Sequence, residues 1–304
     1  MTNVAQDLIN TARRQPEDIA LRLDESEMSY ANLDAASACV AGLLVSRGLR
    51  PGDRVGVMLP NVPYFAMVYF GVLRAGGVVV PMNVLLERQE AAFHLSDAGA
   101  SFIFAWPEFV SAAQGGADAA GAACLVVTPM DFEERLAAAD PVAEPAPRAD
   151  TDIAVILYTS GTTGSRKSVE LTHANLRGDI AVVVDLLALT PSDVILGALP
   201  LFDGYGQTAG LNAAVVTGSC LTLIPRFTPE KAISIIGRDG VTVFEGVPEM
   251  FAAMLHATSG PVATSMRLCI SSGDALPGEV VRTFEKTFGC AVLEHQTASP
   301  VDSP

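Results

Sequence analysis

Short β-branched runs alternate with amphipathic helical patterns along the chain. In the first half, the strand patterns RVGVML (54–59) and VVVPMN (78–83) flank a helical pattern, YFAMVYFGVLRAG (64–76). A second helical pattern precedes the strand pattern SFIFAW (101–106). Strands of this length, separated by single helices, are typical of βαβ units, which place their strands in a parallel sheet. The pattern therefore predicts an α/β fold of mostly parallel sheets flanked by helices.

A change of composition near the middle of the chain marks a joint between two parts. Residues 140–152 (DPVAEPAPRADTD) are rich in Pro, Ala and Asp and lose the periodicity of their neighbours, as an exposed linker does. The strand pattern DIAVILYTS (152–160) follows directly. We therefore expect one α/β subdomain over residues 1–150 and a second over residues 151–304.

Length and composition indicate a folded protein without a nucleic-acid partner. The chain has 304 residues, of which 50% are hydrophobic and 17% charged, as in globular proteins. Its 34 acidic and 19 basic side chains give a net charge of −15. A field of that sign repels nucleic acid and anionic membrane surfaces. An anionic ligand must therefore be held by local groups.

Targeting and metal signals are missing from the sequence. The N-terminal stretch MTNVAQDLINTARRQPED has acids and no apolar core, unlike a signal peptide, and no run of 18 apolar residues predicts a membrane span. The five cysteines form no C-x-x-C pair, and the four histidines have no ligand spacing. We therefore expect a cytoplasmic protein with reduced thiols, no transmembrane segment and no structural metal.

The stretch YTSGTTGSRKSVELTH (158–173) carries the clearest chemical signal. Glycines let backbone N–H groups turn toward an anion, hydroxyls add neutral donors, and a lysine adds a mobile charge. The stretch differs from the G-x-x-x-x-G-K-[ST] nucleotide loop at Arg166, where a side chain would intrude on the phosphates. It follows a strand pattern and precedes a helix that we expect to be capped near Thr172. It predicts a phosphate loop of another kind, with a solvated turn as the alternative.

Further motifs accompany this loop in a fixed order. They read GDRVGVMLPN (52–61), LRAGGVVVPMN (73–83), YTSGTTGSRK (158–167), LPLFDGYGQTAG (199–210), FEGVPEMF (244–251) and CISSGDALPGEV (269–280). Together they resemble the adenylate-forming superfamily, in particular the fatty acyl-CoA ligases, over nearly the whole chain. The resemblance implies that a carboxylate attacks the α-phosphate of ATP, giving an acyl-adenylate and pyrophosphate, and that the thiol of CoA then attacks the acyl carbon.

The resemblance also implies ligands and site residues. ATP, Mg²⁺, CoA and a carboxylic acid are the implied ligands, and a homodimer is compatible with the family. The ATP phosphates would be held by Thr159, Ser160, Gly161, Thr162, Thr163, Gly164 and Lys167. Adenine and AMP would lie against Ser272, Gly273, Asp274, Ala275 and Thr297. The acyl pocket would be lined by Phe202, Asp203, Tyr205, Gly206, Gly246, Val247 and Pro248. The alternatives are an ordinary strand-to-helix turn for the adenine segment and plain core packing for the aromatic residues.

Asp203 stands where acyl-CoA ligases usually carry His. An acid at this position can pair with an amine on the substrate, as a similar Phe-Asp does in amino-acid adenylation domains, or it can mark an altered site. The surrounding motifs favour the fatty acyl branch. Loading of an amino or aryl acid onto a carrier protein is the alternative.

The end of the chain departs from the family pattern. Residues 292–301 read VLEHQTASPV, where relatives have a segment like GYGLSETSPV, whose Tyr stacks on adenine and whose Glu helps to hold Mg²⁺. The chain ends at Pro304, before the ribose-binding acid, the hinge and the small C-terminal lid domain with its catalytic lysine. We therefore assign no catalytic residue or metal ligand and expect little adenylation by these 304 residues alone. A non-catalytic remnant that binds a nucleotide or an acyl ligand is a further alternative.

Overall fold

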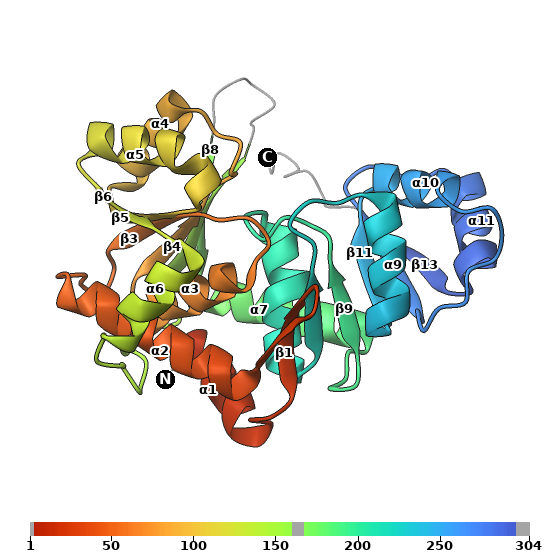
Figure 1. The fold of residues 1–304 in the computed structure, drawn as a ribbon, viewed down its shortest axis with the longest axis horizontal. Helices are drawn as coiled ribbons and strands as arrows, with labels where there is room; N and C mark the ends of the chain where they lie inside the picture. The colour runs from red at the N-terminus through yellow and green to blue at the C-terminus, as the bar shows by residue number, and fades with distance from the viewer. Residues whose placement is uncertain (1–2, 160–166, 296–304) are drawn as a thin grey trace, which may run out of the picture.

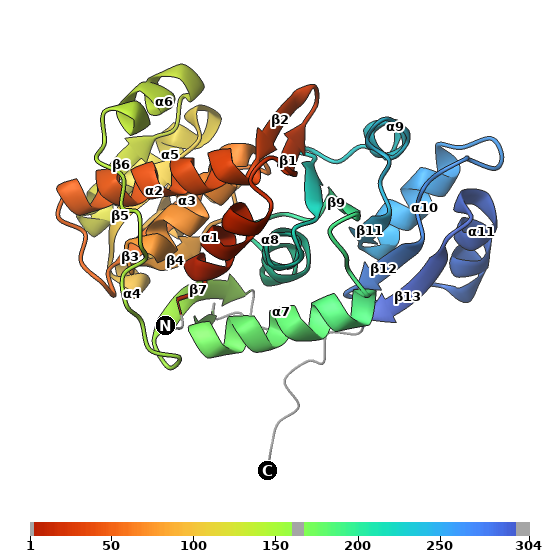
Figure 2. The ribbon, with the colours of Figure 1, turned by 90° about the horizontal axis from the view of Figure 1, so that it is seen from below.

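The computed structural model of the protein describes residues 3–159 and 167–295. These residues form two mainly parallel sheets with helices on their faces, which confirms the predicted α/β class. Figure 1 shows one lobe around each sheet, and Figure 2 shows α7 (His173–Leu187) running along one side of the molecule from near β7 to near β13.

The smaller sheet has the strand order β6-β5-β3-β4-β7-β8. All neighbours are parallel except β7 and β8, which form an antiparallel hairpin. The strands are β3 (Arg54–Met58), β4 (Val78–Pro81), β5 (Ala100–Ala105), β6 (Ala123–Val126), β7 (Ile153–Thr159) and β8 (Lys167–Thr172).

The larger sheet has the order β13-β12-β11-β9-β10-β1-β2, with only the terminal strand β2 antiparallel to its neighbour. The strands are β1 (Ile19–Leu23), β2 (Ser26–Ser29), β9 (Val194–Gly197), β10 (Cys220–Leu223), β11 (Val243–Gly246), β12 (Leu268–Ser272) and β13 (Ala291–His295).

Helices cover both faces of each sheet. Besides α7 they are α1 (Ala5–Arg14), α2 (Tyr30–Ser46), α3 (Pro63–Arg74), α4 (Arg88–Ala98), α5 (Val110–Ala120), α6 (Pro129–Ala137), α8 (Ala213–Thr217), α9 (Pro229–Asp239), α10 (Pro248–His256) and α11 (Gly278–Phe288). A 3-10 turn, η1 (Pro107–Phe109), precedes α5, and a π-helical segment, η2 (Gly206–Asn212), precedes α8. No helix in the described part of the chain is both long and apolar enough to cross a membrane.

Both sheets draw strands from both halves of the chain. β7 and β8 lie beyond residue 150 yet belong to the smaller sheet, whereas β1 and β2 pair into the larger one. The predicted linker at 140–152 is a stretch without helix or strand. The division into subdomains at residue 150 stays a proposal.

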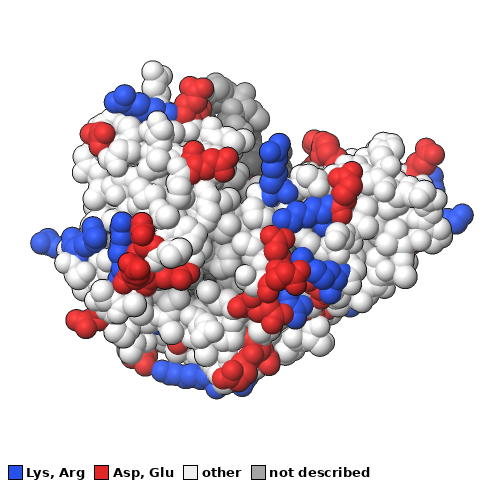
Figure 3. All heavy atoms as spheres, in the orientation of Figure 1, with Lys and Arg blue, Asp and Glu red and all other residues white. Residues whose placement is uncertain are grey.

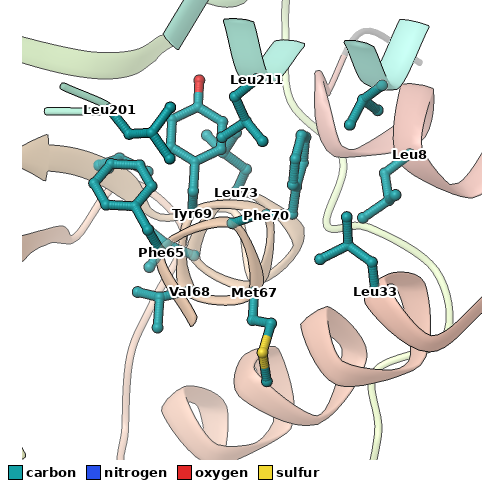
Figure 4. Packing of buried hydrophobic residues seen from close by; sticks show 14 of the residues in the cluster. Leu8, Leu33, Phe65, Met67, Val68, Tyr69, Phe70, Leu73, Leu201 and Leu211 are labelled. Atoms are coloured by element: carbon teal, nitrogen blue, oxygen red, sulfur yellow. The ribbon is translucent and has the colours of Figure 1, made fainter. Parts of the chain in front are cut away.

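Helix α3 ties the two sheets together. Its residues from Phe65 to Arg74 are all buried, because it packs in a core cluster shared by both sheets. Figure 4 shows Phe65 and Tyr69 of α3 beside Leu201 and Leu211, which come from the segment after β9. Burial of such side chains contributes about 1.5 to 3 kcal/mol each. This packing holds η2 between the sheets.

A hydrogen-bonded carboxylate joins the beginnings of three adjacent strands of the larger sheet. Asp193, which is 5% exposed, precedes β9 and accepts hydrogen bonds from Arg267 Nε (2.9 Å) before β12 and from Thr242 Oγ1 (2.7 Å) before β11. It also accepts from the backbone N–H and hydroxyl of Thr190. Burial alone would raise the pKa of Asp193, but the hydrogen bonds hold it at about 2. The ionised carboxylate therefore holds together the amino ends of β9, β11 and β12. These ends lie at the edge of the sheet opposite the carboxyl ends of the same strands.

Candidate functional site

The candidate site lies at the carboxyl ends of neighbouring parallel strands. β9, β11, β12 and β13 are adjacent and run in the same direction, so their carboxyl ends meet at one edge of the larger sheet. Open α/β sheets bind ligands outside this edge. Residues 202–206 come after β9, residues 247–248 follow β11, and residues 273–275 follow β12. The fold thus brings together the predicted acyl-pocket and adenine segments, which belong to separate motifs of the sequence.

The surface is hollowed between the two lobes (Figure 3). A cavity of about 390 Å³ lies where the β7–β8 hairpin, α7 and the start of η2 meet. It is lined by Leu157, Leu171, Asp179, Val182, Val183, Gly204, Tyr205 and Thr208. The hairpin that carries the predicted phosphate loop therefore adjoins the predicted acyl-pocket segment.

The predicted phosphate loop connects β7 to β8. Thr159 pairs with Lys167 at the end of this hairpin, and Lys167 is exposed. The other predicted phosphate-binding residues, Ser160, Gly161, Thr162, Thr163 and Gly164, lie outside the described residues. The described strands hold the cationic side chain directly beside the predicted loop.

The predicted adenine segment follows β12. Ser272 is buried at the end of the strand, whereas Gly273, Asp274 and Ala275 are exposed. Gly273 has a φ of 90°, a conformation that glycine adopts without a steric penalty. No heavy atom of residues 3–159 and 167–295 lies within 4 Å of where a Cβ on Gly273 would be, so these residues leave the space above the turn open. Thr297, the last predicted adenine contact, lies outside the described residues.

The acid predicted from the sequence, Asp203, serves the local backbone. It is exposed, and its Oδ1 accepts a hydrogen bond from the Tyr205 backbone N–H at 2.9 Å. Phe202 is half-buried and packs against the shared core cluster, as the core-packing alternative expects. Asp203 thus shapes the turn into η2, and its role toward a substrate stays a prediction.

Two predicted pocket glycines are required by packing. A Cβ on Gly206 would lie 2.3 Å from the carbonyl oxygen of Pro200, and one on Gly246 would lie 2.6 Å from Cζ of Phe244. After Gly246, Val247 is extended and Pro248 occupies the first turn of α10, where its missing N–H costs nothing. Close approach of neighbouring atoms therefore explains both glycines without a ligand.

Replacing Gly206 by Ala is expected to lower the free energy of unfolding by about 1 to 3 kcal/mol, because the added methyl group must displace the 199–200 backbone. Gly178→Ala on α7 is the matched control, since a Cβ there would meet no atom of the described residues within 4 Å. A helix-interior alanine should stabilise the control by roughly 0.5 to 1 kcal/mol. Urea denaturation of both variants measures the two changes, and a neutral Gly206→Ala would contradict the packing argument.

A buried acid in this region was not predicted from the sequence. Glu245 on β11 is 2% exposed, and its Oε1 has no hydrogen-bond partner among residues 3–159 and 167–295. Burial raises the pKa of Glu245 to about 8. The signal that could have revealed it is an acid within the apolar strand pattern VTVFEGVP (241–248). A buried, unpaired acid at a strand end marks a candidate functional group.

An open turn and a buried hydroxyl lie at the predicted adenine segment. The turn at Gly273 is open, and the nearby Oγ of Ser271 is buried without a hydrogen-bond partner in the described chain. No group of three or more His, Cys, Asp or Glu side chains suited to a metal ion occurs in the described ranges. We therefore assign no Mg²⁺ ligand.

Comparisons with known proteins identify the family. Residues 8–296 match the family described as AMP-binding enzyme. The chain is 29% identical to a long-chain-fatty-acid–CoA ligase of Bacillus subtilis, over 97% of the chain and 60% of that protein. It is 33% identical to a sulfoacetate–CoA ligase of Cupriavidus necator, over 91% of the chain and 57% of that protein.

Solved structures agree with this result. A benzoate CoA ligase from Burkholderia xenovorans has a TM-score of 0.89 at 28% identity, covering 97% of the chain and 60% of that structure. ATP-bound MatB from Rhodopseudomonas palustris has a TM-score of 0.89 at 29% identity, covering 100% of the chain and 62% of that structure. The chain thus spans about 60% of the length of these relatives. The resemblance inferred from the motifs is confirmed, and the chain belongs to the AMP-binding enzyme family.

Proposed function

We propose that the chain is the ATP- and acid-binding part of an acid–CoA ligase, which activates a carboxylic acid as its acyl-adenylate and transfers the acyl group to CoA. The observation that carries the proposal is the convergence of segments 202–206, 247–248 and 273–275 at one edge of the larger sheet. Three of the four relatives named above are called CoA ligases, and the fourth was solved with ATP bound. Because the chain spans only part of them, the activity of the whole protein belongs to the proposal.

Each segment has a role in this proposal. The turn at 272–275 would hold the adenine, and Lys167 with its loop would hold the phosphates. The acid would bind beside Tyr205 at the start of η2. Adenylation brings two anions together, so it depends on positioning and on donors aimed at the transferring group. Mg²⁺ bound with ATP would supply further charge neutralisation at the phosphates. In a chain of net charge −15, the cation of Lys167 matters for holding ATP.

The class of acid is the finer part of the proposal. The motifs favour a medium- or long-chain fatty acid, and the Bacillus subtilis relative supports that class. Sulfoacetate and benzoate in the names of other relatives support alternatives. An amino or aryl acid loaded onto a carrier protein stays the second candidate. A cytoplasmic location and a homodimer stay predictions.

Replacing Lys167 by Ala is expected to weaken ATP binding roughly tenfold. Charge-assisted hydrogen bonds contribute about 1.5 to 3 kcal/mol, and exposure of Lys167 argues for the lower end of this range. About 1.4 kcal/mol corresponds to a factor of ten in Kd. Calorimetric titration of ATP into the wild-type chain and the variant measures the difference.

Lys286→Ala provides the matched control, because Lys286 is an exposed lysine on α11. Its removal should leave the ATP affinity within about twofold of the wild type, since exposed charges are strongly screened. Equal ATP affinity of wild type and Lys167→Ala would show that this lysine does not contact the nucleotide. A wild-type chain that binds no ATP would contradict the proposed function itself.

A further inference from the structure

The side chain of Glu245 faces the side of the sheet on which η2 and the proposed acid-binding region beside Tyr205 lie. Alternate residues of a strand face opposite sides of the sheet. Phe244 packs in the cluster beneath α9, α10 and α11, whereas Val243 packs in the shared core cluster together with Leu211 of η2. Glu245 therefore faces the same side as Val243, toward η2, and it lies one residue before the end of β11.

Oε1 of Glu245 is buried and has no hydrogen-bond partner among the described residues. The residue beside it on β12 is the apolar Ile270, and no ion pair joins Glu245 to a described Lys, Arg or His. Burial raises the pKa of Glu245, and no charge among the described residues offsets this desolvation. A buried polar group without a partner is costly, and native structures retain few of them. A partner from outside the protein would remove this cost.

The carboxyl group lies near an aromatic ring that borders a cavity. The charge of Glu245 contributes, after burial, to the raised pKa of Tyr205, so the two groups lie within electrostatic range. Tyr205 lines the 390 Å³ cavity beside the β7–β8 hairpin. Two residues after Tyr205, Gln207 of η2 has a buried Nε2 without a hydrogen-bond partner in the described chain. A carboxylate and an aromatic ring together suit an ammonium group, because the ring face attracts cations.

We propose that Glu245 is a specificity-determining residue for a carboxylic acid that carries a cationic nitrogen at the end remote from its carboxylate. This inference rests on the proposed function and specifies the class of carboxylic acid that the ligase would activate. The cation would pair with Glu245 and pack against Tyr205, while the substrate carboxylate would point toward the nucleotide. A hydrocarbon acid would leave the buried Oε1 of Glu245 without a partner. Asp203, the acid suggested by the sequence, is exposed and already bonded to the Tyr205 backbone.

Matched pairs of acids that differ in one charge test the proposal. 4-(Trimethylammonio)butanoate and 5,5-dimethylhexanoate have the same shape, as do 4-aminobutanoate and pentanoate. Acid-dependent ATP–pyrophosphate exchange is measured with the protein that contains this chain. At least one cationic acid should have a kcat/KM about tenfold or more above its neutral partner, because about 1.4 kcal/mol of pairing suffices for this ratio.

Glu245→Gln should reduce that ratio to near one, mainly by raising KM for the cationic acid. A general loss of folding would instead lower the exchange for both acids of a pair. Glu249→Gln, which alters an exposed acid on α10, should leave the ratio unchanged. ATP titration of each variant checks that the nucleotide site remains intact.

The outcomes separate this inference from the proposed function. Exchange with hydrocarbon acids that exceeds exchange with both cationic acids would overturn the role of Glu245 and leave the ligase proposal standing. An unchanged ratio in Glu245→Gln would also overturn it. A protein that neither binds ATP nor exchanges pyrophosphate with any acid would overturn the proposed function, and this inference with it.

Discussion

Replacing Asp193 by Ala is expected to lower the free energy of unfolding by about 2 to 4 kcal/mol. Asp193 is almost fully buried and accepts hydrogen bonds from Arg267, Thr242 and Thr190. Removal of one partner of a buried ion pair costs about 3 to 5 kcal/mol. We expect a smaller loss because the side chain of Arg267 is 38% exposed and can be hydrated in the variant. Urea denaturation measures the change.

Two controls sharpen this experiment. Asp193→Asn keeps the size and part of the hydrogen bonding, so it should lose less stability than Asp193→Ala. Asp185→Ala removes an exposed acid from the nearby α7 and should change stability by less than about 0.5 kcal/mol. A loss below about 1 kcal/mol for Asp193→Ala would show that the strand beginnings hold together without the carboxylate.

Stability of the ligand-free chain is expected to fall as the pH rises from about 5 to about 8, through Glu245. Burial raises the pKa of Glu245 from 4.5 to about 8 in the folded chain. Between these values the folded state holds a proton that the unfolded state has lost, so stability decreases with rising pH. The stabilisation from protonated Glu245 is fully present below its pKa in the unfolded chain and is lost as the pH rises to its pKa in the folded chain. The loss between pH 5.5 and 8 is roughly 3 kcal/mol, at about 1.36 kcal/mol per pH unit.

Denaturant titrations at several pH values test this expectation. Other groups titrate in the same range, so the measured quantity is the difference between wild type and Glu245→Gln. Glutamine cannot ionise. The free energy of unfolding of Glu245→Gln should therefore exceed that of the wild type by an amount that grows toward pH 8. Glu249→Gln should keep the wild-type slope. Parallel pH profiles for the wild type and Glu245→Gln would mean that Glu245 is hydrated rather than buried.

Local patterns in the sequence determined most of the secondary structure. The pattern at 64–76 corresponds to α3 (Pro63–Arg74), and RVGVML corresponds to β3. The predicted cap is confirmed, since Thr172 Oγ1 accepts a hydrogen bond from the backbone N–H of Asn175 at 3.1 Å. These features depend on residues within one or two turns of each other, so their physical causes are present in the local sequence. The collinear motifs likewise determined the family.

Only the tertiary structure decided how the strands are shared and which acid is buried. Leu21 pairs with Leu221, a partner 200 positions away, and no local pattern specifies such a contact. Asp203 and Glu245 are both acids within predicted pocket motifs, yet one is exposed and the other buried. The difference arises because the side chain of Glu245 points from a central strand into the core between the sheets, whereas Asp203 lies in an exposed turn. Burial depends on the elements packed above a residue, and those elements come from distant parts of the chain.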